Sequence, residues 1–483
     1  MRKLFFIWIL LLALPEVKSQ YFLKDYPKSG TQWIYGVAEK DGYFYTAGAN
    51  YSGYISFDLL KFDSDGDTIY WKRFKDTSIE MGPASTSVIP TDSTTLLVPA
   101  YKYEAGEYHQ YLFISNTDGD SIATTSPLGG MEGGVTWGIQ NEKVVAFTGA
   151  ELDTGTGKNK LLILITNNLG QTLIHKTWQY GGFNTEGSEI DTTLDNGYII
   201  SSSYTNGTLT FPMAVKFDSL GNYQWHKLLA YNSLHGGGVT VKTLSDGSFL
   251  FTGGIDLDNS SFGYNFQRYV AKLNSNGSIR WEKDFGMVES GINYVEIFGG
   301  SVQLPNGNLI VLAAQKDTAD AFLDKVWLSS MDTAGNIGWN RCYNTCEYIL
   351  MFSNLLLAND NQSIYVVGYS NCVATGEDLF ILKVDTNGCL IPGCSVGVQE
   401  NDSEIYPFTV FPNPSNGQFS IDLSNKSFEG TIMVENTLGE TALQKEVNFQ
   451  NTATFNISNA PKGIYIISLR SKTQLLNSKV ILE

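Results

Sequence analysis

A short motif returns along this chain at a nearly constant interval, and it constrains the fold more than any other feature. Well-preserved copies occupy residues 61–72, 216–227 and 272–283. Each has Lys, an apolar residue, Asp or Asn, and Gly three positions later, followed by a Trp-containing segment that ends in Lys. The central glycines of these and four degraded copies are Gly66, Gly119, Gly170, Gly221, Gly277, Gly335 and Gly388. Successive glycines are 51 to 58 residues apart, which indicates a repeat architecture.

Each repeat contains two turn signals between short apolar runs. The first is an Asp-Gly or Asn-Gly pair, as at 41–42, 196–197 and 306–307, and these residues tolerate the positive φ that tight hairpins need. The second is the motif itself, in which Gly takes the left-handed position of the turn. Two hairpins give four antiparallel strands per repeat, which is typical of a propeller blade. We therefore predict an all-β chain with a seven-bladed β-propeller over residues 20–395.

The seventh repeat lacks its last strand. After Gly388 the chain offers no Trp-x-Lys segment, whereas residues 20–27 (Gln-Tyr-Phe-Leu-Lys-Asp-Tyr-Pro) align with the last strand of another repeat, 281–286. We predict that residues 21–26 supply the outer strand of the last blade. This pairing would join the first and last blades and remove the exposed edges of a linear array.

The first nineteen residues have the features of a secretory signal peptide. Arg2 and Lys3 precede an apolar run over 4–14, and Ser19 is a small residue at the expected cleavage position. A membrane anchor is the alternative, but the run is shorter than the ~20 residues that a spanning helix needs. We expect the mature chain to contain no transmembrane segment. The net charge of −17 disfavours nucleic acid and anionic membranes as partners.

All five cysteines lie between Cys342 and Cys394. An exported chain occupies a compartment where disulfides persist. Cys389 and Cys394 flank a Pro-Gly turn and are the candidate pair, although the odd count leaves the connectivity open. Metal binding would need histidines, and none lies near these cysteines, so we expect no metal site.

The repeat pattern stops at Ser395. Residues 396–406 form a polar, acidic connector and are predicted to be a linker. Residues 407–483 contain short strands with alternating apolar positions, such as Phe419, Ile421 and Leu423 on one face. This pattern predicts a small Ig-like β-sandwich.

The C-terminal motifs, taken in order, resemble the type A sorting domain of the type IX secretion system, which is found in the Bacteroidetes. The residues that carry the resemblance are Phe411, Pro412, Asn413, Pro414, Gly417, Gly439, Gly463 and Tyr465. The family usually has Tyr where this chain has Phe411. The resemblance implies export by the signal peptide, outer-membrane passage through the type IX machinery, and a place outside the cell, either released or on its surface. A plain β-sandwich accessory domain is the alternative.

Candidate ligand-binding residues lie in or near the segments that enter the first strand of each repeat. Equivalent segments converge on one end of a propeller, where their aromatic rings and carboxylates can face a ligand. The candidates are Trp33, Trp137, Glu186, Glu189, His235, Glu289 and Tyr294. Aromatic rings stack on sugars, and paired carboxylates perform glycoside hydrolysis when suitably spaced. Solvated acidic loops are the simpler alternative.

These features favour an exported, surface-associated, non-catalytic binding module for an extracellular protein or glycan. The motif resembles the Trp-containing blade repeat of quinoproteins, but Trp is missing beside Gly119 and Gly388, and we expect no cofactor. A secreted polysaccharide-active enzyme, hydrolase or lyase, that uses the loop carboxylates is one alternative. A structural or adhesive surface protein is another.

Overall fold

A computed structural model describes most of the chain. The described residues are 21–27, 31–51, 55–74, 80–83, 88–91, 94–104, 107–125, 134–141, 144–207, 209–230, 235–256, 266–285, 295–317, 323–343, 349–373, 376–390, 408–436, 441–470 and 475–483. The chain divides into two units, Met1–Val396 and Gly397–Glu483. The regular structure of the described residues is entirely β. No helix among them is long and apolar enough to cross a membrane.

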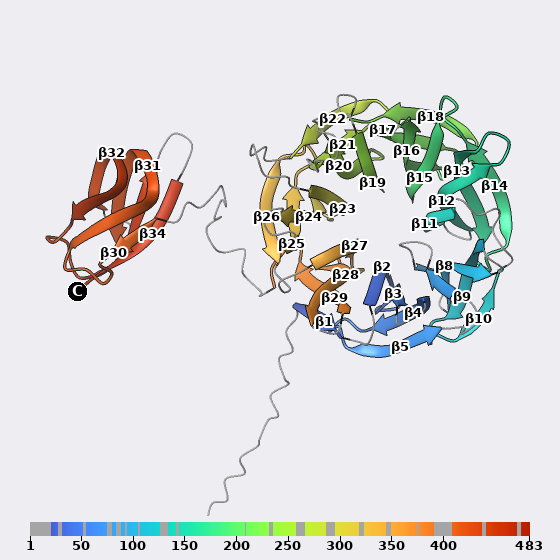
Figure 1. Ribbon diagram of the computed structural model, residues 1–483, viewed down its shortest axis with the longest axis horizontal. Helices are drawn as coiled ribbons and strands as arrows, with labels where there is room; N and C mark the ends of the chain where they lie inside the picture. The colour runs from blue at the N-terminus through green and yellow to red at the C-terminus, as the bar shows by residue number, and fades with distance from the viewer. Residues whose placement is uncertain are drawn as a thin grey trace, which may run out of the picture. The chain divides into compact units, whose positions relative to one another are not determined.

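The first unit is a seven-bladed β-propeller whose described strands form six four-stranded sheets and one five-stranded sheet. Figure 1 shows the blades around a central axis, with β11, β15, β19 and β23 nearest the axis and β14, β18, β22 and β26 at the rim. Blade 1 contains β2 (Thr31–Lys40), β3 (Tyr43–Tyr51), β4 (Ile55–Phe62) and β5 (Thr68–Phe74); blade 2 contains β6 (Glu80–Pro83), β7 (Ile89–Pro90), β8 (Thr95–Glu104), β9 (Glu107–Asn116) and β10 (Ser121–Thr124); blade 3 contains β11 (Gly134–Asn141), β12 (Val144–Asp153), β13 (Lys158–Asn167) and β14 (Thr172–Trp178).

The remaining blades follow the same order from the axis outward. Blade 4 contains β15 (Asn184–Thr192), β16 (Tyr198–Asn206), β17 (Leu209–Phe217) and β18 (Tyr223–Leu228); blade 5 contains β19 (His235–Thr243), β20 (Phe249–Asp256), β21 (Phe266–Leu273) and β22 (Ile279–Asp284); blade 6 contains β23 (Val295–Gln303), β24 (Leu309–Asp317), β25 (Leu323–Met331) and β26 (Ile337–Tyr343); blade 7 contains β27 (Ile349–Leu357), β28 (Ser363–Val373), β29 (Gly376–Asp385) and β1 (Phe22–Tyr26). The seven-bladed, all-β fold predicted from the repeat is confirmed.

The repeated motif forms the turn between the third and fourth strands of each blade. In blade 4, the N–H of Gly221 donates to the carbonyl of Asp218 (3.0 Å), and Asp218 Oδ1 accepts from the N–H groups of Leu220 (2.9 Å) and Asn222 (2.8 Å). Gly221 has a φ of +69°, which a side chain would strain. The Asp or Asn at the first position therefore fixes the turn, and Gly permits it. The equivalent carboxylate of Asp63 is used in the same way, which supports a turn rather than a calcium loop.

The same Gly also creates the space that joins neighbouring blades. A Cβ on Gly277 in blade 5 would lie 2.9 Å from the ring of Trp225 on the outer strand of blade 4, so only Gly admits the ring. Equally close pairs are Tyr70 with Gly119, Trp281 with Gly335 and Trp339 with Gly388, whereas a Cβ on Gly221 would make an ordinary contact of 3.5 Å with Ile174. Two residues beyond these apolar positions, a Lys reaches the residue after the next Gly: Lys72 to Asp120, Lys176 to Asn222 and Lys283 to Asn336. The motif thus couples each blade to the next.

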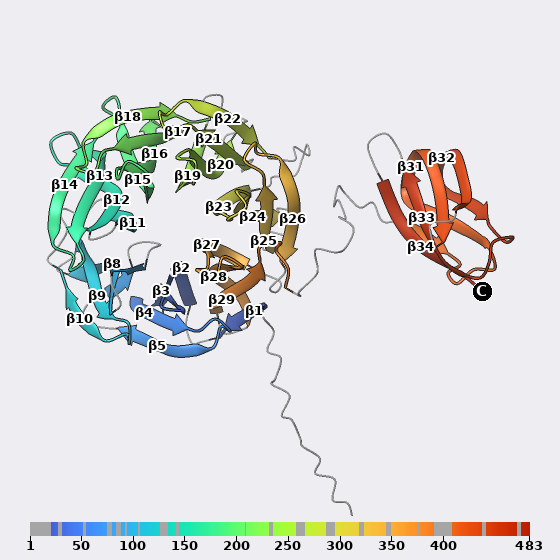
Figure 2. The same cartoon turned by 180° about the vertical axis from the view of Figure 1, so that it is seen from behind.

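Strand β1 performs the same role between blade 7 and blade 1. It pairs antiparallel with β29, with Phe22 opposite Lys383 and Tyr26 opposite Leu379, and both views of the unit show β1 beside β29 (Figure 2). Phe22 is buried and fills the space that Gly66 leaves, and Lys24 contacts Asp67 at 2.9 Å. The N-terminal strand therefore reproduces the aromatic and Lys contacts of an internal repeat, and it closes the ring.

The second unit is a β-sheet domain with the strand order β30-β31-β33-β34, in which β32 also pairs with β31. Its strands are β30 (Thr409–Phe411), β31 (Gln418–Asn436), β32 (Thr441–Asn456), β33 (Gly463–Arg470) and β34 (Leu475–Leu482). Alternating residues of these strands build one core, which includes Phe419, Ile421, Val434, Ile467 and Val480. The alternation predicted from the sequence therefore selects the buried face.

Candidate functional site

The two ends of the propeller are chemically different. We call the end that carries the Asp-x-x-Gly turns the turn end. Antiparallel pairing places the hairpins between second and third strands, and the crossovers between blades, at the opposite end, which we call the crossover end. In blades 3 and 4 the crossover end includes the hairpins at 153–158 and 206–209 and the crossover 179–183. These segments carry the most distinctive described surface of the propeller.

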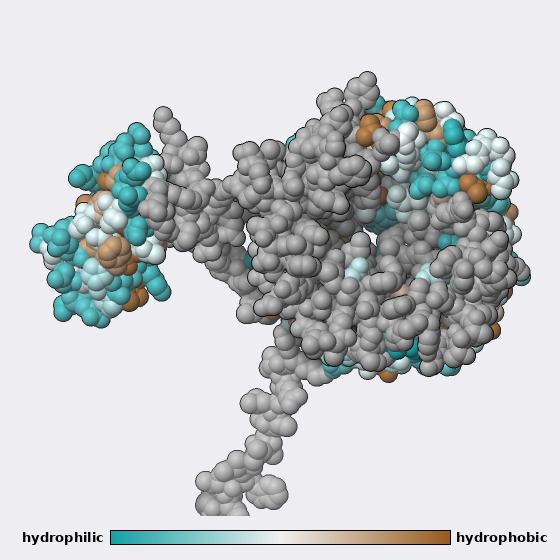
Figure 3. Space-filling model, viewed as in Figure 1, coloured by the Kyte–Doolittle hydropathy of each residue, from teal (hydrophilic) through white to brown (hydrophobic). Residues whose placement is uncertain are grey.

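Seven aromatic rings form a connected cluster that starts at this end and follows the junction of blades 3 and 4. We call it the aromatic patch; it consists of Trp178, Tyr180, Phe183, Tyr204, Phe211, Tyr223 and His226. Six of the side chains are half-buried, and Tyr223 is 43% exposed. In Figure 3 the described surface of these blades, at the upper right, shows hydrophobic and hydrophilic residues side by side. The patch is therefore partly accessible to solvent.

The rings touch in a continuous sequence. Trp178 and Tyr223 are parallel within 6°, with centroids 5.1 Å apart, which is an offset stack. Tyr180 lies 4.7 Å from Tyr204, and Tyr204 lies 5.2 Å from Phe211 at an angle of 23°. Offset stacking leaves part of each ring face uncovered. The planes of Tyr180 and Tyr204 are tilted by 56°, so the uncovered ring faces of the patch point in different directions.

His226 connects the outer strand of blade 4 to the patch. Its ring packs 5.0 Å from Tyr180 in an edge-on arrangement, and its Nδ1 lies 2.8 Å from the hydroxyl of Tyr223. Burial lowers the pKa of His226 below its usual value. The neutral imidazole is therefore favoured near pH 7, and in its Nε2–H tautomer Nδ1 accepts the hydrogen bond from Tyr223.

Internal hydrogen bonds hold the crossover 179–183 in one conformation. The N–H of Phe183 donates to the carbonyl of Tyr180 (2.9 Å), and Gln179 Nε2 donates to the carbonyl of Phe183 (3.0 Å). Thr185 Oγ1 accepts from the N–H of Tyr180 (3.1 Å) and donates to Phe183 (3.1 Å). The backbone that presents Tyr180 and Phe183 is thus fixed before any ligand arrives.

Glu186, a predicted site residue, lies in the polar rim of the patch. It is exposed, and its Oε1 accepts a hydrogen bond from Asn159 Nδ2 at 2.8 Å. Asn184 Oδ1 accepts from the N–H of Asn159 (3.0 Å), and Lys158 Nζ donates to the carbonyl of Gly182. The rim therefore offers an amide-rich set of donors and acceptors directly beside Phe183.

Glu189, the second predicted acid of this strand, has a different environment. Its Oε2 accepts a hydrogen bond from the N–H of Val241 on the inner strand of blade 5, at 3.0 Å. The residue as a whole is half-buried, but the carboxyl end lies against blade 5, and burial raises the pKa of Glu189 to about 8. Asp191 also raises this pKa, while the Val241 N–H and Lys242 oppose the shift.

Asp191 continues this junction between blades 4 and 5. Its Oδ2 accepts from the N–H of Thr243 (2.7 Å) and lies 3.3 Å from Lys242 Nζ. The negative charge of Asp191 is the main cause that raises the pKa of Lys242. Carboxylates that accept backbone N–H groups of the adjacent inner strand fix the two blades together. Glu189 therefore bonds to the backbone of the next blade, whereas Glu186 is exposed and bonds to the side chain of Asn159 in the preceding blade.

The other predicted site residues are described less fully. Trp33 lies in β2, Trp137 in β11 and His235 in β19, but only their backbone positions are described. Glu289 and Tyr294 lie outside the described residues. No cluster of three or more His, Cys, Asp or Glu side chains suited to a metal ion occurs among the described residues. Cys389 is disulfide-bonded, whereas Cys394, its candidate partner, is not described.

Sequence reasoning missed most of the aromatic patch. Tyr180 and Phe183 belong to a crossover near which only the acids Glu186 and Glu189 were predicted as site residues. Tyr204 and Phe211 belong to ordinary strands. The available signal was the position of Tyr204 and Phe211 on either side of the hairpin 206–209, four strand residues beyond the buried Ile200 and Val215. Aromatic residues that continue the buried face of a strand beyond the end of the hydrophobic core lie at the end of the blade, where they are partly exposed.

The C-terminal motif binds the first strand of its domain to the last. Asn413 Oδ1 accepts from the N–H of Ile481 (2.9 Å), and its Nδ2 donates to the carbonyl of Lys479 (2.9 Å). The backbone of Ser415 then exchanges bonds with Ile481 (2.8 Å) and Glu483 (2.9 Å). The side chain of Asn413 and the backbone of Ser415 thus extend the sheet at β34.

The remaining motif residues shape the same fold. The peptide bonds before Pro412 and Pro414 are cis, and Phe411 is 47% exposed. Gly417 has a φ of +103°, and a Cβ there would overlap the backbone of Ser458. Gly463 begins β33, and Tyr465 is buried with its hydroxyl donating to Pro461 (2.7 Å). Gly439 lies outside the described residues.

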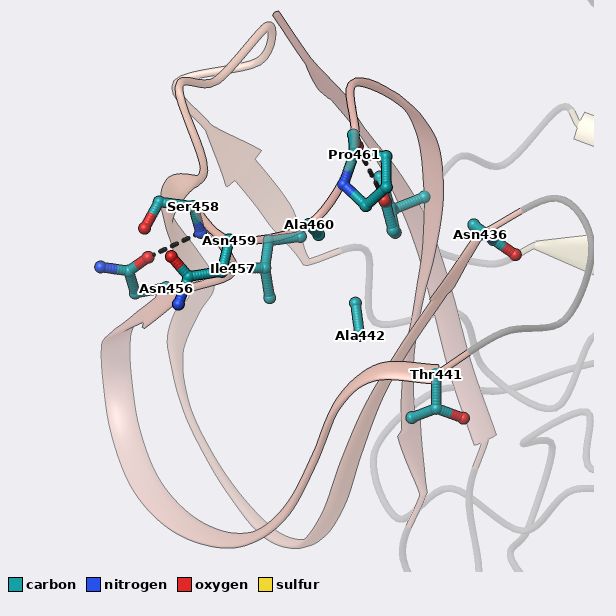
Figure 4. A pocket seen from close by; sticks show the side chains of 10 residues that line it. Asn436, Thr441, Ala442, Asn456, Ile457, Ser458, Asn459, Ala460 and Pro461 are labelled. Atoms are coloured by element: carbon teal, nitrogen blue, oxygen red, sulfur yellow. Dashed lines mark hydrogen bonds between the residues drawn. The ribbon is translucent and has the colours of Figure 1, made fainter.

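A cavity of about 450 Å³ opens in this domain beside the loop that precedes β33 (Figure 4). Its lining is polar or small and includes Asn436, Thr441, Asn456, Ser458 and Pro461. Figure 4 shows the bond from the N–H of Ser458 to Asn456 Oδ1, which is 2.8 Å long. Among the described lining residues, Tyr465 is the one titratable side chain, and its hydroxyl donates to Pro461.

Comparison with known proteins identifies the C-terminal domain. Residues 409–483 match the family described as secretion system C-terminal sorting domain. No curated protein sequence matches the chain at a significant level. Together, the fold and this match define an exported β-propeller protein, located in the medium or on the outer surface. The family match covers the sorting domain alone, so it leaves the activity of the propeller open.

Solved structures with a similar fold are distant in sequence. A protein of unknown function from Dyadobacter fermentans is 10% identical and has a TM-score of 0.44, covering 75% of this chain and 99% of its own. A periplasmic gluconolactonase from Pseudomonas aeruginosa is 11% identical, with a TM-score of 0.41 and coverage of 74% and 97%. The β-propeller domain of a protease from Pyrococcus furiosus is 7% identical, with a TM-score of 0.40 and coverage of 74% and 96%.

Proposed function

We propose that the propeller is a non-catalytic binding module whose ligand surface is the aromatic patch at blades 3 and 4. The observation that carries the proposal is the connected set of seven half-buried or exposed rings, beside a rim of amide groups. Soluble proteins seldom expose contiguous apolar surface without a binding partner. Large rigid rings also contribute contact area at little cost in conformational entropy.

A catalytic role is the second candidate, and one observation favours it. The pKa of Glu189 is raised to about 8, as in the general acid of a glycosidase. However, Glu189 Oε2 already accepts the Val241 N–H, and a carboxylate engaged in joining two blades is poorly placed to transfer protons to a substrate. We therefore assign Glu189 to the blade junction.

The test is a screen of the mature full-length protein against oligosaccharides and peptides, measured for both binding and turnover. A binding module gives saturable binding without products, and Tyr204→Ala weakens it while Leu220→Ala, at the exposed turn end of the same blade, leaves it unchanged. Product formation that is abolished by Glu189→Gln or Glu186→Gln would instead establish the enzyme.

For export we propose a finer division of the chain: a signal peptide over 1–19, the propeller over 20–395, a linker over 396–406 and the sorting domain over 407–483. The type IX secretion machinery is the proposed partner of the last segment. Deleting residues 407–483 should leave the protein in the periplasm of a host that has this machinery. Normal appearance of the truncated protein in the medium would refute the assignment.

A further inference from the structure

We infer that the aromatic patch binds a neutral oligosaccharide, an inference that rests on the proposed binding function and narrows its ligand. Pyranose rings with equatorial substituents present flat faces of C–H groups and edges of hydroxyl groups. A matching site therefore needs aromatic rings for the faces and polar groups beside them for the edges. The patch and its rim provide both.

The ring sequence matches an extended chain of sugar units. Tyr180, Tyr204 and Phe211 follow one another at centroid distances of 4.7 and 5.2 Å, and Trp178 and Tyr223 continue the cluster along the outer strands. Because the ring planes differ by 56° between Tyr180 and Tyr204 and by 23° between Tyr204 and Phe211, a twisted oligosaccharide can place neighbouring units against different rings. A single sugar would use only part of this surface, so affinity should increase with chain length.

The composition of the patch favours a sugar over an apolar peptide. Tyr180, Tyr204 and Tyr223 place hydroxyl groups among the ring faces. Tyrosine is favoured at binding surfaces where its ring contacts apolar groups and its hydroxyl contacts polar groups or water. Burial, with the nearby Tyr180, raises the pKa of Tyr204, so its hydroxyl stays protonated and able to donate. Aliphatic side chains, in contrast, would offer no hydrogen-bond partner to these hydroxyl groups.

The charges of the rim favour a neutral ligand. Its described ionisable groups balance: Lys158 donates to Gly182, Glu186 accepts from Asn159, and Asp153 and Lys160 of the same hairpin form an ion pair at 2.8 Å. The formal charge of the chain is −17. Uronic acid or sulfated chains would meet this negative potential without a cationic cluster in the described rim to offset it.

The site is also prepared for binding before the ligand arrives. The hydrogen bonds within 179–185 fix the backbone that carries Tyr180 and Phe183, and Asn184 Oδ1 anchors the neighbouring hairpin through the N–H of Asn159. A preformed surface avoids the entropy cost of ordering loops on binding.

The experiment is isothermal titration of the mature full-length protein with cellohexaose, xylohexaose and laminarihexaose, with oligogalacturonate as the charged probe and an aromatic-rich peptide as the peptide probe. At least one neutral hexaose should bind more tightly than its disaccharide. Tyr204→Ala should weaken binding about tenfold, whereas Tyr204→Phe, which keeps the ring, should retain most of it. Leu220→Ala is the control at the turn end. Thermal melts of each variant confirm that the fold is intact.

The outcomes separate the ligand class from the binding function. Binding of the peptide probe, lost in Tyr204→Ala, without binding of any hexaose would overturn the saccharide inference and leave the proposed function standing. If oligogalacturonate binds as tightly as the neutral hexaoses, the inference that the ligand is neutral would be overturned. Hexaose binding that is unchanged in Tyr204→Ala would show that the patch is not the site, and this result would overturn both proposals.

Discussion

The turn end and the crossover end of the propeller are formed by the same strands but are under different structural constraints. At the turn end, seven copies of one motif repeat the same hydrogen bonds, and most of their glycines contact the outer strand of the preceding blade. At the crossover end of blades 3 and 4, the loops differ from each other, and their aromatic side chains remain partly exposed. Structural requirements thus constrain the first end, and the second is free to acquire a ligand surface.

The contact that closes the ring is the most sensitive test of this difference. Phe22→Ala removes a buried ring from the space beside Gly66, and we expect the free energy of unfolding to fall by about 3 kcal/mol. Lys24→Ala in the same strand removes a partly exposed ion pair with Asp67 and should cost less than about 1 kcal/mol. Denaturant unfolding of both variants measures the difference. Equal, small losses would mean that β1 contributes little to closure.

A second test compares two glycines with positive φ. Gly277→Ala at the turn end combines backbone strain (φ +83°) with a Cβ placed 2.9 Å from Trp225, and we expect a loss of about 2 kcal/mol. Gly157→Ala, in the crossover-end hairpin of blade 3, has a φ of +65° but no atom within 4 Å of the added Cβ. Its loss should be about 1 kcal/mol, from backbone strain alone. Identical losses would contradict a packing role for the motif Gly.

The same contrast explains what could be predicted from the sequence. The turn end depends on local rules: Asp218 fixes a turn, Gly221 permits its φ, and a repeat of these residues sets the blade count. Because the seventh repeat lacks its last strand, the sequence also indicated that residues 21–26 supply this strand. The alternating strands and ordered motifs of the sorting domain were readable for the same reason.

The crossover end could not be predicted in the same way. The aromatic patch assembles Trp178 from blade 3 with Tyr204 and His226 from blade 4, and no local pattern reports a contact between strands of different blades. His226 belongs to an outer strand, yet its ring packs against Trp178 and Tyr180. Glu186 and Glu189 are three residues apart in one strand, yet a bulge between Gly187 and Glu189 changes their surroundings.

The pH dependence of stability tests whether Glu189, on the inner strand β15, has a structural role like that of the motif residues at the turn end. Its folded pKa of about 8 exceeds the usual 4.5, so the folded state retains a proton that the unfolded state has lost between these values. The stabilising contribution is therefore complete below about pH 4.5 and is lost as the pH rises through 8. Glu189→Gln keeps an acceptor for Val241 but cannot ionise. Relative to the variant, the wild-type protein should lose stability progressively between pH 5 and pH 9 in denaturant titrations. A constant difference across this range would show that Glu189 is not buried at the blade junction.

The smallest expected effect is a change in Tm for a substitution in the outer strand β18. This strand carries Tyr223 of the aromatic patch and Trp225 of the repeated motif. Tyr223 is 43% exposed, and its hydroxyl donates to His226, so Tyr223→Phe removes one hydrogen bond and keeps the ring stacked on Trp178. We expect a change in Tm of no more than about 2 °C. Trp225→Ala, two residues away, empties the space beside Gly277 and should lower Tm several times further, because the motif contact is lost. Differential scanning calorimetry of the two variants measures the contrast. Equal shifts would mean that the exposed ring of Tyr223 is as structural as the half-buried ring of Trp225. The separation between a constrained end and a free end would then fail in β18, where the two meet.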